Sequence, residues 1–180
     1  SSRHPMADYP AHLVHDHRLF DGRTVVIRPV RPDDALRMHE FLDGLSKTNR
    51  YFRFQKWIGK PSEKLARYLV EIDYDRHMAF VCAAGAGADA PIVGDARYNV
   101  NTDGESCEFG VMIADAWHNT GIAGLLMDDL IGAARRRGLK RMEGLVLRVN
   151  PTMLRFARGL GFAVTDVPED RTTMCIVKEL

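Results

Sequence analysis

The chain has 180 residues, and its 25 lysines and arginines nearly balance its 24 aspartates and glutamates, which leaves a formal net charge of +1. This length favours one domain with a substantial core, and the balanced charge gives no indication of nucleic acid as a partner. No apolar run approaches the ~20 residues that span a bilayer. Three widely spaced cysteines, Cys82, Cys107 and Cys175, suggest reduced thiols, and the first ten residues lack the apolar stretch of a signal peptide. We therefore expect a cytoplasmic protein without a membrane partner.

Residues 1–20 are polar and mixed, and we expect them to form a mobile or lightly docked N-terminal extension ahead of a single domain over residues 21–180. Three histidines of this extension, His12, His15 and His17, lie close together in the sequence. No metal-ligand spacing of carboxylates or thiolates accompanies them, so they give little support for a metal site, and we expect no metal.

Strand and helix patterns alternate through the first half of the domain. Residues 24–30 are rich in β-branched side chains and predict a strand, and residues 32–43 predict a helix whose acidic first turn suits the helix dipole. Residues 46–72 predict a broken helical region in two or three pieces, interrupted at residues 59–61 by glycine and proline. An apolar strand is expected over residues 77–84.

A hairpin and the clearest helix of the chain follow. Residues 92–100 and 106–113 predict strands joined by an N-T-D-G turn. Residues 121–137 carry apolar side chains on one half of the helical wheel, which predicts an amphipathic helix. Three arginines and then Gly138 end it, as the helix dipole and a left-handed cap favour.

The last part of the chain predicts strands over residues 141–147, 162–165 and 172–177, and a helix over residues 151–160 that ends at Gly161. Hairpins interrupt the alternation of strands and helices, and no internal repeat is visible. We therefore expect an α/β (mixed α+β) fold whose sheet is not uniformly parallel.

The stretch W-H-N-T-G-I-A-G-L-L at residues 117–126 places small residues at the start of the best helix. The first turn of a helix has unsatisfied N–H donors and a partial positive charge, and missing side chains let a pyrophosphate approach the backbone. The alternative is that Asn119 or Thr120 caps an ordinary helix and the glycines only permit packing. No Lys-Ser/Thr pair follows, so the turn is not a P-loop.

The wider stretch at residues 107–126 resembles the coenzyme A-binding core of the GNAT acetyltransferase superfamily. There a strand leads into Q/R-x-x-G-x-G/A, which residues 118–123 match except that histidine stands at the first position and threonine where a basic residue is common. The resemblance implies that the turn binds the cofactor through His118, Asn119, Thr120, Gly121, Ile122, Ala123 and Gly124.

A closer resemblance covers almost the whole chain. Residues 9–13, 21–35, 50–54 and 72–81 are similar to the acetyltransferase domain of Pat-type bacterial protein lysine acetyltransferases. This likeness implies the GNAT fold, a twisted mixed sheet of about seven strands flanked by helices, with two splayed central strands that bind acetyl-CoA. It also implies an exposed lysine of a protein, such as an acyl-CoA synthetase, as the acceptor.

Glu108 matches the glutamate that serves as general base in Pat-like enzymes. A lysine ammonium of pKa ~10.4 costs roughly 4.6 kcal/mol to neutralise at pH 7, and a base supplies the route for its proton. We expect partial burial to raise the pKa of this carboxyl group. The alternatives are an exposed strand-edge glutamate at this position, or Glu105 as the base.

The same strand is expected to pair with the amides of the pantetheine arm through the main chain of Val111 and Ile113, and Met112 between them is also predicted to bind the cofactor. Glu108 and Val111 fall on opposite faces of a regular strand. The family has a bulge in this strand, and Gly110 is the plausible position for it.

Asn150 either contacts the pantetheine arm or caps the helix that Pro151 begins. Arg155 is a candidate for the 3′-phosphate of the cofactor. No tyrosine lies between Asn150 and Gly161, where many superfamily members have one to protonate the leaving thiolate.

Tyr74 and Asp75 precede a predicted strand and are candidates for contact with the acceptor lysine; loop anchoring is the alternative for both. Two other functions stay open at this point, transfer to a small amine and non-catalytic binding of coenzyme A. Both a monomer and a homodimer are compatible with the sequence.

Overall fold

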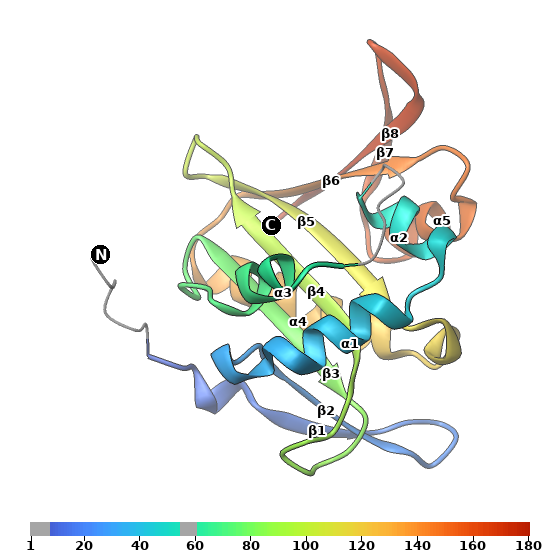
Figure 1. The fold of residues 1–180 in the computed structure, drawn as a ribbon. Helices are drawn as coiled ribbons and strands as arrows, with labels where there is room; N and C mark the ends of the chain where they lie inside the picture. The colour runs from blue at the N-terminus through green and yellow to red at the C-terminus, as the bar shows by residue number, and fades with distance from the viewer. Residues whose placement is uncertain (1–7, 55–60) are drawn as a thin grey trace.

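The computed structural model describes residues 8–54 and 61–180 (Figure 1). The strands are β1 His15–Arg18, β2 Thr24–Pro29, β3 His77–Ala83, β4 Ile92–Val100, β5 Ser106–Ile113, β6 Arg141–Leu147, β7 Ala163–Val167 and β8 Asp170–Glu179. The helices are α1 Ala35–Gly44, α2 Lys47–Phe54, α3 Glu63–Val70, α4 Ile122–Arg136 and α5 Pro151–Gly159, with short 3-10 turns at Ala11–Leu13, Pro32–Asp34 and Asp115–Trp117. The predicted break at residues 59–61 falls largely outside the described residues.

One open sheet of eight strands runs in the order β1-β2-β3-β4-β5-β6-β8-β7. Every neighbouring pair is antiparallel except β5 and β6, which are parallel. The expected mixed α/β fold with helices on both faces is therefore confirmed, with one strand more than the seven expected. None of the helices within the described ranges is both long and apolar enough to cross a membrane.

The additional strand is β1, in the segment that we expected to be only lightly docked. Residues 15–18 pair with β2 along their whole length, and Nε2 of His15 lies 2.5 Å from Oδ2 of Asp129 on α4. That expectation is wrong for these residues, because an edge strand is held by backbone hydrogen bonds and needs no apolar pattern. Within residues 8–54 and 61–180, no group of three or more His, Cys, Asp or Glu could hold a metal ion.

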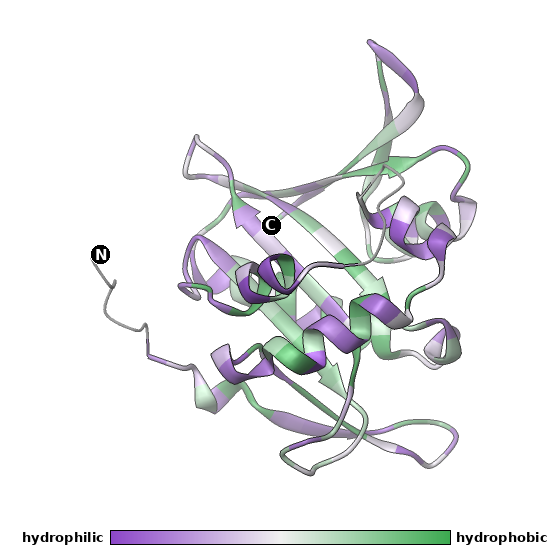
Figure 2. Cartoon of the chain, viewed as in Figure 1, coloured by the Kyte–Doolittle hydropathy of each residue, from purple (hydrophilic) through white to green (hydrophobic). Residues whose placement is uncertain are grey.

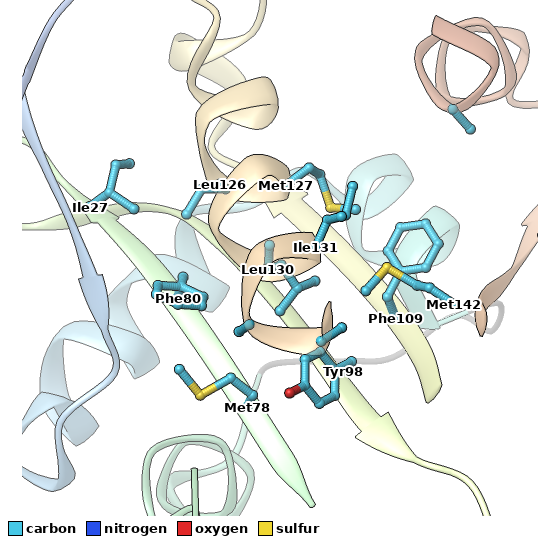
Figure 3. Packing of buried hydrophobic residues seen from close by; sticks show 14 of the residues in the cluster. Ile27, Met78, Phe80, Tyr98, Phe109, Leu126, Met127, Leu130, Ile131 and Met142 are labelled. Atoms are coloured by element: carbon cyan, nitrogen blue, oxygen red, sulfur yellow. The ribbon is translucent and has the colours of Figure 1, made fainter. Parts of the chain in front are cut away.

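Two helical layers cover the sheet. On one face, α4 buries Leu126, Met127 and Leu130 against side chains of the central strands, including Phe80 and Phe109 (Figure 3). On the other face, α1 and α3 pack onto the sheet around a second buried cluster (Figure 1). Figure 2 shows the same division, with hydrophilic residues along the outward side of α1 and hydrophobic residues along β3.

The parallel pair at the centre of the sheet opens into a fork. β5 and β6 pair at only three positions, Ser106 with Arg141, Cys107 with Met142 and Glu108 with Glu143. Beyond these positions β6 pairs with β8, while β5 remains paired with β4 on its other side. The splayed strands implied by the family resemblance are therefore present, and their gap positions the site.

Candidate active site

A cavity of about 1100 Å³ lies at the fork between β5 and β6. Its described walls come from six parts of the chain that are distant in sequence: the start and body of α2, β5 from Glu108 onward, the turn into α4 with its first helical turn, β6, α5, and Ile176 of β8. The predicted site residues that line it are Glu108, Val111, Ile113, His118, Asn119, Gly121, Ile122, Ala123, Gly124, Asn150 and Arg155.

The cavity receives the open N-terminus of α4. Gly121 is the N-cap in a left-handed conformation with φ of 90°, and among the described residues no side chain caps this end of the helix. The first hydrogen bond of the helix runs from the N–H of Leu125 to the carbonyl of Gly121, at 3.3 Å. The N–H groups of Ile122, Ala123 and Gly124 therefore precede the helical hydrogen-bond ladder and are available to an anion in the cavity.

Close packing does not explain the glycines at positions 121 and 124. A Cβ atom built on Gly121 or on Gly124 would meet no atom of the described residues within 4 Å, and both glycines line the cavity. The Thr120 hydroxyl donates to the carbonyl of Trp117 at 2.7 Å and is not turned to the helix N-terminus as a cap. The alternative of an ordinary capped helix with packing glycines is therefore wrong. Thr120, one of the predicted cofactor-binding residues, is not among the described residues that line the cavity.

The edge of β5 that faces the fork carries the main-chain groups of Val111 and Ile113. At the two ends of the β4–β5 ladder, Asn101 donates to the carbonyl of Ser106 and Ala114 donates to that of Val93, both at 2.8 Å. With an unbroken register between them, even-numbered residues of β5 bond to β4 and odd-numbered residues point toward β6. The Ile113 carbonyl confirms this direction, since Nε2 of His118 donates to it at 3.1 Å.

The predicted bulge at Gly110 is absent, because the β4–β5 register is continuous through this position. No bulge is needed: main-chain groups lie in the plane of the sheet, so Val111 can face the fork while Glu108 projects from one face. Met112 is also corrected, since its side chain is buried against α1 and α3 and does not line the cavity.

Glu108 is exposed on the wall of the cavity, and the expected partial burial is wrong. Among the described residues that line the cavity, Glu108 is the only one with a carboxylate. Glu105 lies outside the cavity in the preceding turn, where its carboxylate accepts from Nζ of Lys140 at 3.1 Å. Of the two predicted candidates, Glu108 alone can reach a molecule bound at the fork.

Asn150 and Arg155 both line the cavity on the α5 side. The Asn150 side chain caps α5, with Oδ1 accepting from the N–H of Met153 at 3.3 Å, so the capping interpretation is confirmed. This leaves the Nδ2 end of the same amide for a ligand. Arg155 is exposed on the helix.

Tyr74 and Asp75 lie elsewhere. They border a separate cavity of about 370 Å³ together with Arg137, at the opposite end of α4. The Tyr74 hydroxyl donates to the carbonyl of Val30 at 2.7 Å, burial raises the pKa of this tyrosine to about 12, and Asp75 pairs with Arg137 at 2.7 Å. These are contacts of loop anchors, so the structure does not bring the two residues to the predicted acceptor site.

Sequence reasoning missed the wall formed by α2 and the residue before it. Ser46, Thr48, Asn49, Phe52 and Arg53 line the cavity. Asn49 joins this helix to the end of β5, with Nδ2 donating to the carbonyl of Ile113 and to Oδ1 of Asp115, each at 2.8 Å. These contacts cross more than sixty residues of chain, and no local spacing could have indicated them.

The donors present fit two parts of coenzyme A, its diphosphate and its pantetheine arm. Free N–H groups at a helix N-terminus suit a diphosphate, and the edge of β5 that faces the fork suits the amides of a pantetheine arm at Val111. At Ile113 the carbonyl already accepts from His118 and Asn49. Such an arrangement is that of a protein that binds an acyl-CoA. Residues 24–163 match the acetyltransferase (GNAT) domain family, and the chain belongs to this family of acetyl-CoA-dependent N-acetyltransferases.

Named relatives agree with this assignment. The chain is 37% identical over 154 residues to acetyltransferase PA5475 of Pseudomonas aeruginosa, covering 86% of this chain and 83% of that protein. It is 33% identical over 141 residues to acetyltransferase Pat of Mycolicibacterium smegmatis, covering 78% of this chain but only 41% of Pat. The fold matches the GNAT domain of S. lividans PAT with a TM-score of 0.86 at 24% identity, covering 96% of this chain and all of that domain.

Proposed function

We propose that this acetyltransferase transfers the acetyl group of acetyl-CoA directly to the ε-amino group of lysine side chains on protein substrates, with Glu108 as general base. The observation that carries the proposal is the position of Glu108: an exposed carboxylate, the only one on the described wall of the cavity, on the strand whose free edge faces the fork. An acceptor that is part of a large protein can reach a base placed in this way.

The charge of the cavity favours a protein lysine over a small polyamine. A pocket for a free polyamine needs several carboxylates, whereas Arg53 and Arg155 accompany the single carboxylate of Glu108 among the described lining residues. The resemblance to Pat-type enzymes supports the same acceptor class and suggests acyl-CoA synthetases among the targets. The chain spans about two fifths of the length of the Pat relative, so its substrates are inferred from the domain alone.

Each part of the site has a distinct task in this proposal. The first-turn N–H groups of α4 hold the diphosphate, and the main chain of Val111 holds the pantetheine arm. Bound acetyl-CoA supplies an activated acyl group as a thioester. Glu108 accepts a proton from the acceptor ammonium, directly or through water. Deprotonating a free lysine ammonium at pH 7 costs roughly 4.6 kcal/mol, and the base gives this proton an acceptor within the site.

The first prediction tests this base. The variant Glu108→Gln keeps the size of the side chain but cannot accept the proton, so we expect kcat to fall by about a hundredfold or more. Acetyl transfer to a panel of folded proteins and to a panel of small amines, read by mass spectrometry, gives both the acceptor class and the rate. Glu105→Gln is the matched control, because Glu105 is exposed and does not line the cavity.

Unimpaired turnover of Glu108→Gln across the pH range would remove Glu108 from the mechanism. Transfer to small amines without transfer to proteins would replace the proposed acceptor class. Stabilisation by acetyl-CoA without transfer to any acceptor would leave a binding module.

A further inference from the structure

Phe109 and Gly144 lie at the vertex of the fork. The parallel ladder of β5 and β6 ends with Glu108 opposite Glu143, so Phe109 and Gly144 are the next residues along the two strands. A Cβ atom built on Gly144 would lie 2.9 Å from Cε1 of Phe109 and 3.2 Å from its Cδ1, both shorter than ordinary contact. The Phe109 ring therefore occupies the space of a side chain at position 144 and reaches across the vertex from β5 to β6.

The Phe109 ring is both a wall of the cavity and a part of the buried core. Phe109 and Gly144 line the cavity, yet only 8% of the Phe109 surface is exposed. The ring centroid lies 5.1 Å from that of Phe162, and Figure 3 shows the ring in the core cluster that α4 covers, together with Met142. Since close-packed neighbours hold the ring, it forms a fixed end wall at the vertex.

The length of the pantetheine arm brings the acyl group to this wall. The turn into α4 folds back onto the end of β5, where His118 donates to the carbonyl of Ile113 at 3.1 Å, so a diphosphate at the α4 N-terminus lies near Ile113. From the diphosphate to its sulfur the arm has about a dozen chain atoms, about as many as four residues of extended backbone. Four residues back along β5 from Ile113 stands Phe109. An arm that follows β5 therefore carries its thioester to the vertex.

Apolar side chains surround the space that the ring fills. Val146 and Ile176 belong to the same buried cluster as Phe109 and also line the cavity, and Ile176 is the ladder partner of Gly144. Such surroundings suit the methylene groups of an acyl chain. One methylene more or less in a hydrophobic pocket changes kcat/KM by about 10- to 200-fold, so a single ring at this place is enough to select among acyl chains.

We propose that Phe109 determines which acyl chains the enzyme transfers: its ring, held against Gly144, ends the cavity next to an acetyl group and excludes a butyryl chain. The inference rests on the placement of acetyl-CoA in the proposed function and assigns the choice of acyl chain to one side chain. Phe109 takes no part in the chemical step. Its side chain lies on the opposite face of β5 from that of Glu108, so the ring can be removed without replacing the proposed base.

The test compares acetyl-CoA with butyryl-CoA, using the acceptor that the assay panel identifies. For the wild-type enzyme we expect kcat/KM for acetyl-CoA to exceed that for butyryl-CoA by about a hundredfold or more. Phe109→Ala should lower this ratio by about tenfold or more, because kcat/KM for butyryl-CoA rises. Phe109→Leu should lower the ratio less, because leucine fills part of the space.

Phe80→Leu is the matched control for Phe109→Leu. Phe80 is fully buried in the same cluster but is not among the described residues that line the cavity. Its truncation removes a similar amount of core packing and should leave the ratio unchanged. Thermal unfolding shows which variants fold, and Phe109→Leu decides where Phe109→Ala does not. If the panel yields no acceptor, Kd values of the two thioesters from titration calorimetry replace kcat/KM in the same comparison.

Equal use of the two thioesters by the wild-type enzyme, an unchanged ratio in the Phe109 variants that fold, or the same fall in Phe80→Leu would each overturn the role of Phe109. Unimpaired turnover of Glu108→Gln, or transfer to small amines alone, would refute the proposed function, and the comparison of thioesters would still decide on Phe109. A slow Glu108→Gln with an unchanged ratio in the Phe109 variants would refute only this inference.

Discussion

Gly121 and Gly124 both line the cavity at the start of α4, but their backbones differ. Gly121 has φ of 90°, which L-residues with a side chain rarely adopt, whereas Gly124 lies within the helix, where alanine is the best helix former. At both positions a Cβ would enter open space. Glycine is therefore required by the backbone at position 121, whereas at position 124 only the proposed cofactor in the cavity would require it.

Alanine substitutions at these two positions should change stability in opposite directions. Gly121→Ala should destabilise the protein by about 1–2 kcal/mol through left-handed strain. Gly124→Ala should stabilise it by up to about 1 kcal/mol through helix propensity. Both should weaken acetyl-CoA binding, because each adds a Cβ to a residue that lines the cavity. Urea denaturation measures the two changes in stability, and titration calorimetry measures the binding of acetyl-CoA. A Gly124→Ala variant that loses stability would contradict the conclusion that the backbone at position 124 does not require glycine.

Single residues were predictable where their role depends on near neighbours in sequence. The turn at Gly121 and the cap at Asn150 could be inferred from a few adjacent residues, and the structure has both. Arg53 could not, because its location depends on Gly110, more than fifty residues later in the chain. Tyr74 and Asp75 were wrongly placed at the acceptor site. Their position just before a predicted strand does not show at which end of the sheet that strand begins.

Among the elements, α3 is joined to the sheet by a buried polar network as well as by apolar contacts. Nη1 of Arg97 donates to the carbonyl of Leu69 at 2.9 Å and to Nε2 of His77 at 3.0 Å. The Leu69 carbonyl belongs to the last turn of α3, where helical partners run out. Burial and the nearby Arg97 charge lower the pKa of His77 to about 4.

The depressed pKa of His77 makes stability depend on pH. Its ordinary value is 6.5 and its folded value about 4, so between these limits the unfolded chain binds more protons. The contribution is complete above pH 6.5 and is lost as the pH falls toward 4, at up to about 1.4 kcal/mol per pH unit. His77→Gln should remove this dependence. As the pH falls from 6.5 to 4, the urea midpoints of the wild-type protein and of His77→Gln should therefore converge. A difference between the two midpoints that stays constant over this range would contradict the role given to His77.

The bounds of the elements followed from sequence patterns where side chains are buried. The strands predicted at residues 92–100, 106–113 and 141–147 have those bounds in the structure. β1 was missed because H-D-H-R offers no apolar alternation, and its strand conformation comes from backbone pairing with β2. The packing of α2 on β5 was missed for a related reason: polar contacts between distant elements leave no periodic pattern.

For the molecule as a whole, one parallel strand pair in an otherwise antiparallel sheet creates the site. Because β5 and β6 run side by side for only three positions, the sheet splits where both strands continue, and α4 begins beside the split. The helix of 15 residues then extends about 22 Å to its other end. The smaller cavity near Tyr74 and Asp75 lies at that far end of α4, so it is separate from a ligand bound at the fork.

Coenzyme A should therefore stabilise the fork and leave the far end of α4 unchanged. At about 100 times its Kd a ligand adds ~2.7 kcal/mol, which raises Tm by roughly 5–10 °C for a chain of this size. Hydrogen exchange should slow in residues 109–113, 117–126 and 144–146, and remain unchanged at Tyr74 and Asp75. Pantetheine, which lacks the diphosphate, should raise Tm far less, because it cannot use the N–H groups of α4. Equal stabilisation by pantetheine, or protection centred on Tyr74, would show that the α4 N-terminus is not the anchor of the cofactor.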